Sequence, residues 1–392
     1  MTLSAQVCLG SDRLIASDRL AGQRVGLVCN PASVDLEFQH IADRLGSRAD
    51  TSLVTLFGPQ HGFHAVVQDN MVETGHSRHA RHDVPVYSLY SDTREPTPEM
   101  LEGLDVIVID LQDVGTRVYT YIYTMANCLR AARRHGLSVI VCDRPNPIGG
   151  AAVEGPMLHE GFESFIGQCA IPLRHGMTIG ELAQLFNTHF EIGADLEVVP
   201  MAGWARSMYA DQTGLPWIIP SPNLPTLDSA IVYPGGVLFE GTNISEGRGT
   251  TLPFELIGAP WVNADALCQT LSAEEIQGVL FRPVQFEPTF QKHADHVCGG
   301  CQIHVRDRQT FTPVRAAVAV MQAMRRQASS SFEWRDPPYE YEAVKVPIDI
   351  LSGSESLRNQ IETDLGATEI AESWVPEVEA FERIRRGFLR YE

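Results

Sequence analysis

The sequence is short of basic residues. Its 392 residues include 30 Lys and Arg against 49 Asp and Glu, so the formal net charge at pH 7 is −19. Nucleic acids and anionic membrane surfaces carry negative charge and would repel such a protein. We therefore expect no nucleic acid and no membrane among its partners. A small anionic ligand held by a local group of arginines stays compatible with this charge.

Long apolar runs are missing too. No stretch approaches the ~18 residues of a membrane-spanning helix. The start, MTLSAQVCLGSDRLIAS, has neither the basic nor the apolar segment of a secretory signal. The eight cysteines are scattered, and the one pair with metal or redox spacing, Cys298 and Cys301, has no second pair to complete it. The sequence predicts a cytoplasmic protein without metal or organic cofactor, and it leaves a homodimer open.

A glycine-rich phosphate loop is also absent, which excludes dinucleotide binding despite a clear α/β pattern. Apolar stretches alternate with helix-like segments over the first 150 residues, at 24–29, 52–57, 84–89, 105–109 and 137–142. This alternation predicts a parallel sheet covered on both faces. We predict a Rossmann-like α/β domain over residues 1–255 and a smaller α+β domain over residues 256–392.

Each of the five predicted strands ends in a polar loop. The loops read CNPASVD, FGPQHGF, LYSDTREP, DLQDVGTR and CDRPNPIGG. One such loop is usually a turn, but five at the carboxyl edge of one sheet predict a shared pocket, because ligands of open α/β sheets bind there. The Pro- and Gly-rich stretch 215–260 is too apolar for disorder and too long for a plain connection. Its polar centre, 240–249, predicts a further wall of the site.

Six motifs occur in the order found in one protein family. They are FGPQHGF, DLQDVGTRVYTY, DRPNPIGG, RHGMTIGELA, SPNLPTLDSAIVYPG and EGTNISEGRGTTLPFELIGAPW. With them the chain, from about residue 20 onwards, resembles the bacterial exo-β-N-acetylmuramidases, long catalogued as a domain of unknown function. The resemblance implies a Rossmann-like domain beside a smaller one, with the active site in the cleft between them. It also implies release of N-acetylmuramic acid from the non-reducing end of peptidoglycan fragments, in cell-wall recycling, with a muramic-acid-containing saccharide or muropeptide as partner.

One position departs from the family pattern. Members often read Gly-Pro-Glu-His-Gly, where the Glu is the suspected acid, but here the residue after Pro59 is Gln60. An amide forms hydrogen bonds and transfers no proton, so Gln60 suits orientation of the substrate. We expect the acid elsewhere and favour Glu246, then Asp113, while His61 is a candidate proton shuttle. The other candidate acids are Glu240, Asp110 and Glu154.

Muramic acid carries a lactyl carboxylate, which an arginine fork binds well. Candidates are Arg117, Arg144 and Arg248, although structural pairing of Arg144 with Asp143 or Asp113 would explain that arginine equally. The remaining predicted substrate-binding residues are Asn146, His175, Asn223, Glu240 and Asn243. Two other functions stay open: a muropeptide- or sugar-binding protein that has lost its acid, and a hydrolase of a different acidic small molecule.

Overall fold

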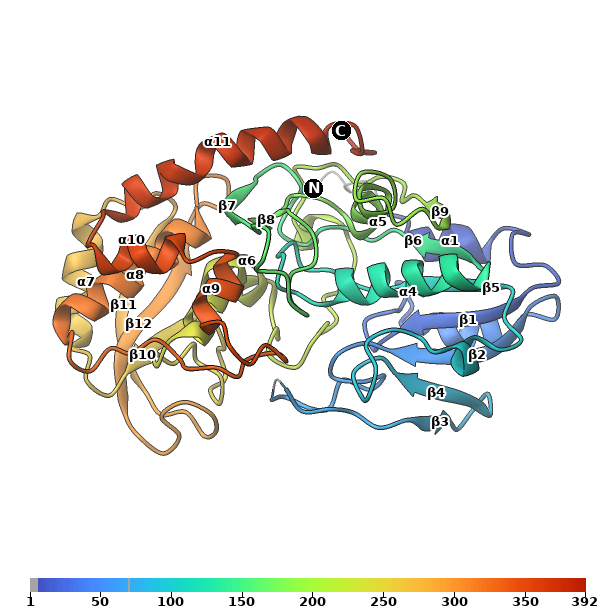
Figure 1. Cartoon of the computed structure of the whole chain (residues 1–392), viewed down its shortest axis with the longest axis horizontal. Coiled ribbons are helices and arrows are strands. Elements are labelled where there is room, and N and C mark those ends of the chain that lie inside the picture. The colour runs from blue at the N-terminus through green and yellow to red at the C-terminus, as the bar shows by residue number, and fades with distance from the viewer. Residues whose placement is uncertain (1–5, 70) are drawn as a thin grey trace.

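A seven-stranded sheet forms the first part of the structure, a computed structural model that describes residues 6–69 and 71–392 (Figure 1). The strand order is β3-β4-β2-β1-β5-β6-β9, and all pairs are parallel except β3 with β4. The five predicted strands are all present, and the direction of winding reverses between β1 and β5. The strands are β1 (Arg24–Cys29), β2 (Ser52–Gly58), β3 (Ser77–His79), β4 (Val84–Ser88), β5 (Val106–Asp110), β6 (Ser138–Cys142) and β9 (Asp195–Val199).

Helices cover both faces of this sheet, as the alternating pattern predicts. The helices α1 (Gly10–Ile15) and α2 (Ile41–Gly46) pack on one face, and α4 (Tyr121–His135) and α5 (Ile179–Thr188) pack on the other. Successive residues of a strand serve opposite faces, so Leu27 joins the core under α1 and α2 while Val28 joins the core under α4 and α5. A short helix, α3 (Pro98–Leu101), precedes β5. The predicted α/β architecture is confirmed.

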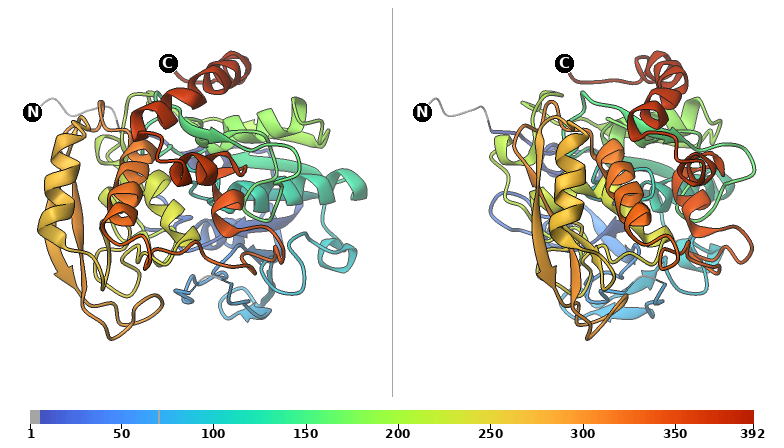
Figure 2. Two further views of the ribbon diagram at one scale, coloured as in Figure 1. Left: turned by 60° about the vertical axis from the view of Figure 1, so that its left-hand side comes forward. Right: turned by 90° about the vertical axis from the view of Figure 1, so that its left-hand side faces the viewer.

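A smaller antiparallel sheet organises the second part. Its order is β10-β12-β11; α7 packs against β11 and β12, and α8 packs against α7 (Figure 2). The stretch 215–260 contains one helix, α6, that continues into the 3-10 turn η2. The elements are α6 (Leu227–Gly236), η2 (Val237–Gly241), β10 (Leu256–Ala259), α7 (Ala264–Ala273), β11 (Val279–Phe286), β12 (Cys298–Val305), α8 (Pro313–Gln327), α9 (Pro347–Ser352), α10 (Ser356–Glu362) and α11 (Ala367–Arg385).

The hairpin of β7 (Glu154–Met157) and β8 (Pro172–Arg174) packs against α11, and the 3-10 turn η1 (Ala210–Gln212) lies in the connection that follows β9. Among the residues that the structure describes, no helix is both long and apolar enough to cross a membrane.

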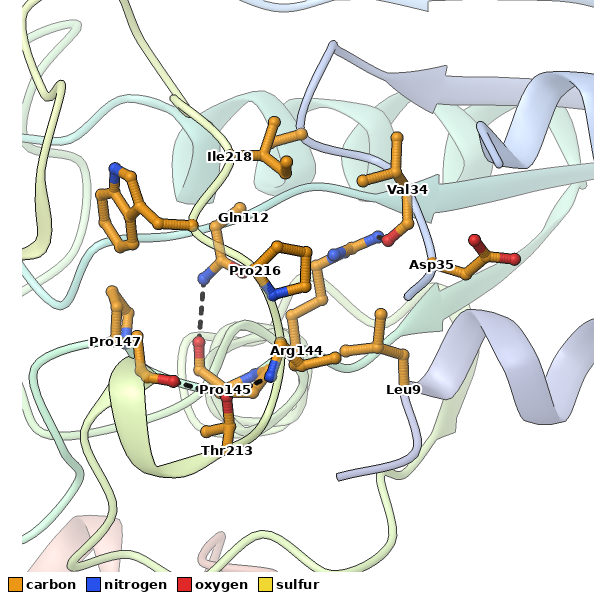
Figure 3. A pocket seen from close by; sticks show the side chains of 14 residues that line it. Leu9, Val34, Asp35, Gln112, Arg144, Pro145, Pro147, Thr213, Pro216 and Ile218 are labelled. Atoms are coloured by element: carbon orange, nitrogen blue, oxygen red, sulfur yellow. Dashed lines mark hydrogen bonds between the residues drawn. The ribbon is translucent and has the colours of Figure 1, made fainter. Parts of the chain in front are cut away.

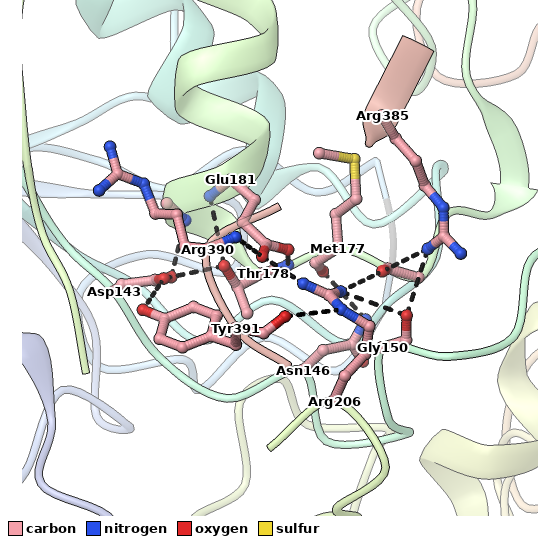
Figure 4. A network of polar contacts seen from close by, with 12 residues as sticks. Asp143, Asn146, Gly150, Met177, Thr178, Glu181, Arg206, Arg385, Arg390 and Tyr391 are labelled. Carbon is pink, nitrogen blue, oxygen red and sulfur yellow. Dashed lines mark hydrogen bonds and ion pairs between the residues drawn. The ribbon is translucent and has the colours of Figure 1, made fainter. Parts of the chain in front are cut away.

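The end of the chain returns to the first part. Helix α11 runs along the top of the molecule, and the residues after it lie near α5 (Figure 1). The Tyr391 hydroxyl donates to the buried Asp143 carboxylate at 2.5 Å, and the backbone N–H of Arg390 donates to Glu181 at 2.8 Å. Glu181 also pairs with Arg206 (Figure 4). The bonds of Arg390 and Tyr391 tie the C-terminal tail to β6 and α5 of the first part.

A Tyr391→Phe variant is expected to lose about 1.5–3 kcal/mol of unfolding free energy, the value of a hydrogen bond to a charged group. Asp143 would keep its bonds from the Thr178 hydroxyl and the Gly180 N–H, so the fold should survive. Urea denaturation measures the change. The control is Tyr209→Phe, which removes a hydroxyl that donates to an uncharged acceptor, the Arg308 carbonyl. Equal unfolding free energies for both variants would contradict this role of the tail.

Candidate active site

The carboxyl edge of the large sheet is divided between two pockets. The first lies where the winding reverses, beyond β1 and β5, and residues 210–218 cover it (Figure 3). Its lining includes Arg144, whose Nε and Nη2 donate to the two oxygens of Asp110 at 2.6 and 2.8 Å. Both side chains are buried. The structural pairing considered for Arg144 is therefore present, with Asp110 as the partner, and its guanidinium is already engaged.

The second pocket, called the interdomain pocket below, is built by both parts of the chain. The first part contributes Gln60 and His61 from the loop after β2, residues 118–121 before and at the start of α4, and Asn223. The second contributes Tyr233, Glu240, Arg248, Phe254, Tyr339 and Glu340. The enclosed space is about 40 Å³, room for a few water molecules.

The loop after β2 presents Gln60 through a tight turn. The N–H of Gly62 donates to the carbonyl of Pro59 at 2.9 Å, and His61 and Gly62 both have positive φ, +68° and +77°. Glycine adopts that conformation without strain, which accounts for the Gly at the end of the motif. The Gln60 carbonyl oxygen accepts from the Thr120 hydroxyl at 2.6 Å. Thr120 is the N-cap of α4, yet its hydroxyl serves Gln60 instead of the helix.

Glu340 enters the same pocket from a strained hairpin turn of the second part. Tyr339 and Glu342 exchange two backbone hydrogen bonds of 2.9 Å, and the central residues, Glu340 and Tyr341, have φ of +44° and +69°. Such two-residue turns favour Asn and Gly, and a non-glycine residue there costs of order 1–3 kcal/mol. This turn places the Glu340 side chain inside the protein, where it is only 3% exposed.

Two side chains of the first part hold the Glu340 carboxyl. The Gln60 amide donates to its Oε1 at 3.5 Å, and the Tyr90 hydroxyl donates to its Oε2 at 3.1 Å. Burial raises the pKa of Glu340 to about 7, and the nearby Glu240 carboxylate raises it further, against the opposing effects of Tyr90, Arg248 and Gln60. A carboxyl group with this pKa is partly protonated near neutral pH.

Glu240 has a different environment. Its Oε1 accepts from Arg248 Nη2 at 2.6 Å and its Oε2 accepts from the Tyr339 hydroxyl at 2.6 Å. The neighbouring anions Glu240 and Glu246 raise the pKa of the Arg248 guanidinium although burial lowers it. Burial, followed by the charge of Arg248, lowers the pKa of His61 to about 4. His61 is therefore neutral at pH 7, and Arg248 is the cation among the residues that line this pocket.

Glu246, the acid favoured from the sequence, is buried beside the pocket and is not among its lining residues. It pairs with Lys292 at 2.8 Å and with Arg248 at 3.2 Å. Burial raises the pKa of Glu246, but these two cations outweigh burial and hold the pKa below its usual value. A carboxylate stabilised in this way is a poor proton donor.

Three further predicted residues lie together away from the interdomain pocket. His175 Nε2 is 3.3 Å from Asp113 Oδ2, and both side chains are buried. Asp113 accepts from the Gly115 N–H, and Asn146 donates to the Met177 carbonyl. These contacts knit the loops after β5, β6 and β8 to one another. Asp113, Asn146 and His175 are absent from the linings of both pockets.

The other predicted residues are dispersed. Asn223 lines the interdomain pocket and donates to the Gln68 carbonyl at 2.6 Å. Asn243 lines a separate open groove beside Lys292 and Trp334. Arg117 is fully buried and donates to three backbone carbonyls. Glu154 lies in β7, where it accepts from the Arg315 N–H. Of the aromatic side chains, Tyr119 lines the interdomain pocket and Trp204 packs in a small core cluster.

Sequence reasoning missed Glu340 and Tyr90. Glu340 occurs in PPYEYEAV, which reads as an ordinary surface turn, because a pair of prolines followed by alternating Tyr and Glu predicts nothing else. Its closeness to Gln60 joins residues 280 positions apart in the chain, and local sequence holds no signal for such a contact.

Comparison with known proteins also divides the chain into two parts. The family model for the N-terminal part of the exo-β-N-acetylmuramidase NamZ matches residues 25–228, and the model for its C-terminal part matches residues 231–391. The peptidoglycan β-N-acetylmuramidase NamZ of Bacillus subtilis strain 168 is 44% identical over 388 residues, which is 98% of this chain and 92% of the relative.

Two solved structures are also similar. Both are DUF1343-family proteins of Bacteroides fragilis NCTC 9343, with 34% and 27% identity and TM-scores of 0.90 and 0.78, and each comparison covers 99% of both chains. The interdomain pocket takes residues from both matched segments. The resemblance found in the sequence is confirmed: the chain belongs to the exo-β-N-acetylmuramidase family.

Proposed function

We propose that this protein hydrolyses the β-glycosidic bond of an N-acetylmuramic acid residue at the non-reducing end of peptidoglycan fragments, and that the interdomain pocket is where it does so. The observation that carries the proposal is the composition of that pocket. Both matched segments contribute to it, and it combines tyrosine rings, one cation and two carboxyl groups with different environments. Glycosidases of most families work with a pair of carboxyl groups at the scissile bond.

Arg248 is the residue that we assign to the lactyl carboxylate of the sugar. It is the cation of the pocket lining, and an arginine bound to a carboxylate forms strong, oriented hydrogen bonds. Arg248 itself pairs with Glu240 and Glu246, but the other two arginine candidates lie outside the lining of this pocket, where Arg144 pairs with Asp110 and Arg117 donates to backbone carbonyls. Tyr119 and Tyr233 supply ring surface for the sugar, and Asn223 supplies a polar side chain of the lining.

A 2-acetamido sugar brings its own nucleophile. Its carbonyl oxygen can attack the anomeric carbon, so the protein needs a proton donor for the leaving oxygen rather than a nucleophilic carboxylate. The sequence-based assignments of Glu246 and Asp113 to catalysis remain predictions, but their positions outside the lining favour a structural part for both.

The test of the proposed function compares two chromogenic substrates, the 4-nitrophenyl β-glycosides of N-acetylmuramic acid and of N-acetylglucosamine. We expect turnover of the muramide and much weaker turnover of the glucosaminide. Muropeptide fragments analysed by mass spectrometry should lose N-acetylmuramic acid from the non-reducing end only. Thermal stabilisation by muramic acid without turnover of any muramide would favour the non-catalytic binding protein instead.

Chelation is expected to leave turnover of the muramide unchanged. Within residues 6–69 and 71–392, no three or more His, Cys, Asp or Glu side chains are grouped so that they could hold a metal ion. Cys298 and Cys301 are buried in β12. Turnover measured before and after dialysis against EDTA checks this expectation, and a loss that zinc or magnesium restores would contradict it.

We also propose a reducing compartment, the cytoplasm, as the place of action. All eight cysteines lie within the described residues, and none forms a disulfide, which is the usual state of cytoplasmic proteins. The fragments would then be substrates in cell-wall recycling. The homodimer left open by the sequence remains a prediction.

A further inference from the structure

We propose that Glu340 is the general acid of this reaction, and that Gln60 is the residue that positions its carboxyl group. The inference rests on the proposed function and adds to it the residue that transfers the proton. The sequence motifs do not contain Glu340, and it reaches the pocket only through the fold.

The backbone around Glu340 is the first argument. Two consecutive non-glycine residues at positive φ are unfavourable, and such strain persists only where the surrounding structure holds it. Here the contacts of Tyr341 stabilise the turn: its ring lies 3.9 Å from the Arg94 guanidinium, and its hydroxyl donates to Glu73. The turn of the second part is thereby pinned to the first part, with the Glu340 carboxyl directed into the pocket that both parts line.

The second argument is the contrast between two neighbouring carboxyl groups. Glu240 accepts from both Arg248 and Tyr339, so its charged form is well stabilised. Within the described residues, the hydrogen-bond donors to the Glu340 carboxyl are neutral, Gln60 and Tyr90; the charge of Arg248 acts on it without a hydrogen bond, and the carboxyl faces the Glu240 carboxylate. When the surroundings of two carboxyl groups shift their pKa values in opposite directions, one group can serve as the acid and the other as a stabilising anion. Glu340 is then the group that holds a proton when the substrate binds.

The chemical step follows from this division. The Glu340 proton passes to the glycosidic oxygen while the bond from that oxygen to the anomeric carbon breaks, and its electron pair leaves with the released alcohol. The acetamido carbonyl oxygen forms a bond to the anomeric carbon, which gives a cyclic oxazolinium ion. Water then adds to the anomeric carbon and its proton passes to the Glu340 carboxylate. The oxazolinium ring opens and gives N-acetylmuramic acid. Glu340 ends in the state in which it began.

Gln60 acts through Glu340 in this scheme. The Thr120 hydroxyl donates to the amide oxygen of Gln60, and the amide nitrogen therefore faces Glu340. A donor of this kind fixes the carboxyl without titrating. Since the bond favours the charged carboxylate, it also lowers the pKa of Glu340 slightly, against the effects of burial and of Glu240. A glutamate at position 60 would instead form a coupled carboxyl pair with Glu340.

The test uses Glu340→Gln and two substrates that differ in their need for an acid. On a disaccharide of N-acetylmuramic acid and N-acetylglucosamine, whose leaving alcohol must be protonated, kcat/KM should fall by about 10²–10⁴-fold. On the 2,4-dinitrophenyl β-muramide, which leaves readily as an anion, the loss should stay below about tenfold, because general-acid assistance contributes little there. Binding of muramic acid, followed by thermal shift, should persist and shows that the variant is folded.

The pH profile supplies the second readout. For the wild type, kcat/KM on the disaccharide should fall as pH rises through about 7, the pKa of Glu340, because the deprotonated carboxylate cannot act as an acid. His61 titrates well below this range. Glu340→Gln should lack this fall. The matched control is Glu255→Gln, since burial also raises the pKa of Glu255 but that residue lies outside the pocket lining; it should keep the wild-type profile.

For Gln60→Ala we expect a loss of roughly tenfold in kcat/KM, the equivalent of one neutral hydrogen bond. The fall at high pH should move to higher pH, because the carboxylate of Glu340 loses a donor. A merely structural part for Gln60 would lower the rate without that shift.

The outcomes separate the two proposals. If the wild type cleaves the muramides while Glu340→Gln keeps disaccharide activity within tenfold, or loses both substrates equally, Glu340 is not the acid and the muramidase activity stands. If the wild type cleaves no muramide, the proposed function fails and this inference fails with it.

Discussion

An Arg248→Met variant is expected to lose most of its activity toward muramides. The substitution removes the cation that we assign to the lactyl carboxylate, and truncating one partner of a buried, hydrogen-bonded charge pair costs about 2–5 kcal/mol. That range corresponds to roughly 30- to several-thousand-fold in kcat/KM. The loss has a second source in the protein, because Glu240 would keep only the Tyr339 hydroxyl of its two donors described above.

Substrate preference distinguishes carboxylate recognition from general damage to the pocket. Kinetics on the muramide and on the glucosaminide, which lacks the lactyl group, should show that Arg248→Met loses far more on the muramide. The preference of the wild type would then largely vanish. Arg248→Lys should retain part of it, because a point charge remains but the fork does not. An unchanged preference in Arg248→Met, with both activities reduced alike, would remove Arg248 from recognition of the lactyl group.

Arg117→Met is expected to be the most destabilising substitution described here. The guanidinium is completely buried and donates to the carbonyls of Pro156 and Ile171 at 2.8 and 2.9 Å, and to that of Leu351 at 2.8 Å. The variant would leave three buried carbonyl oxygens without this donor, and of these the Ile171 oxygen keeps the N–H of Leu158 at 3.3 Å. A buried carbonyl left unsatisfied costs about 1–3 kcal/mol. We expect a loss of about 3–5 kcal/mol, the upper range for single substitutions.

Calorimetry and urea denaturation of purified Arg117→Met measure that loss. A matched control is Arg133→Met, since Arg133 also donates to two backbone carbonyls, those of Glu191 and Ile192, but near the surface of the molecule. Its unfolding free energy should change by less than about 1 kcal/mol. A similarly small change for Arg117→Met would show that water or a repacked side chain donates to the carbonyls that have lost the guanidinium.

The pattern of the large sheet was predictable because its signals are local. Continuous apolar strands, the capping box at Thr178 and Glu181, and polar loops at strand ends depend on neighbours a few positions away. The same holds for the turn that carries Gln60, where Gly62 reveals the backbone conformation. The predicted convergence of all loops on one pocket differs from the structure, because the loops after β1, β5 and β6 line the pocket that residues 210–218 cover, whereas the loop after β2 lines the interdomain pocket.

The acid that we propose, Glu340, has no signal in the sequence for a different reason, and the assignment of Glu246 stays a prediction. Glu246 stands in a polar motif with flexible neighbours, which is what a catalytic residue on a loop would show, but Lys292 comes from a distant segment and neutralises it. The reverse is true of Glu340, whose neighbours in sequence suggest a surface turn. In both cases the pKa is set by side chains that lie far away in the chain, and sequence alone does not reveal them.

The return of the chain end to the first sheet has a consequence for synthesis. Asp143, directly after β6, accepts a hydrogen bond from Tyr391, which lies 248 positions later in the chain. Translation proceeds at about 5–20 residues per second. Tyr391 is therefore made on the order of ten seconds or more after Asp143, and the carboxylate lacks this donor during that time. The nascent first domain therefore emerges as an unfinished unit, and its last hydrogen bonds can form only when the tail has left the ribosome.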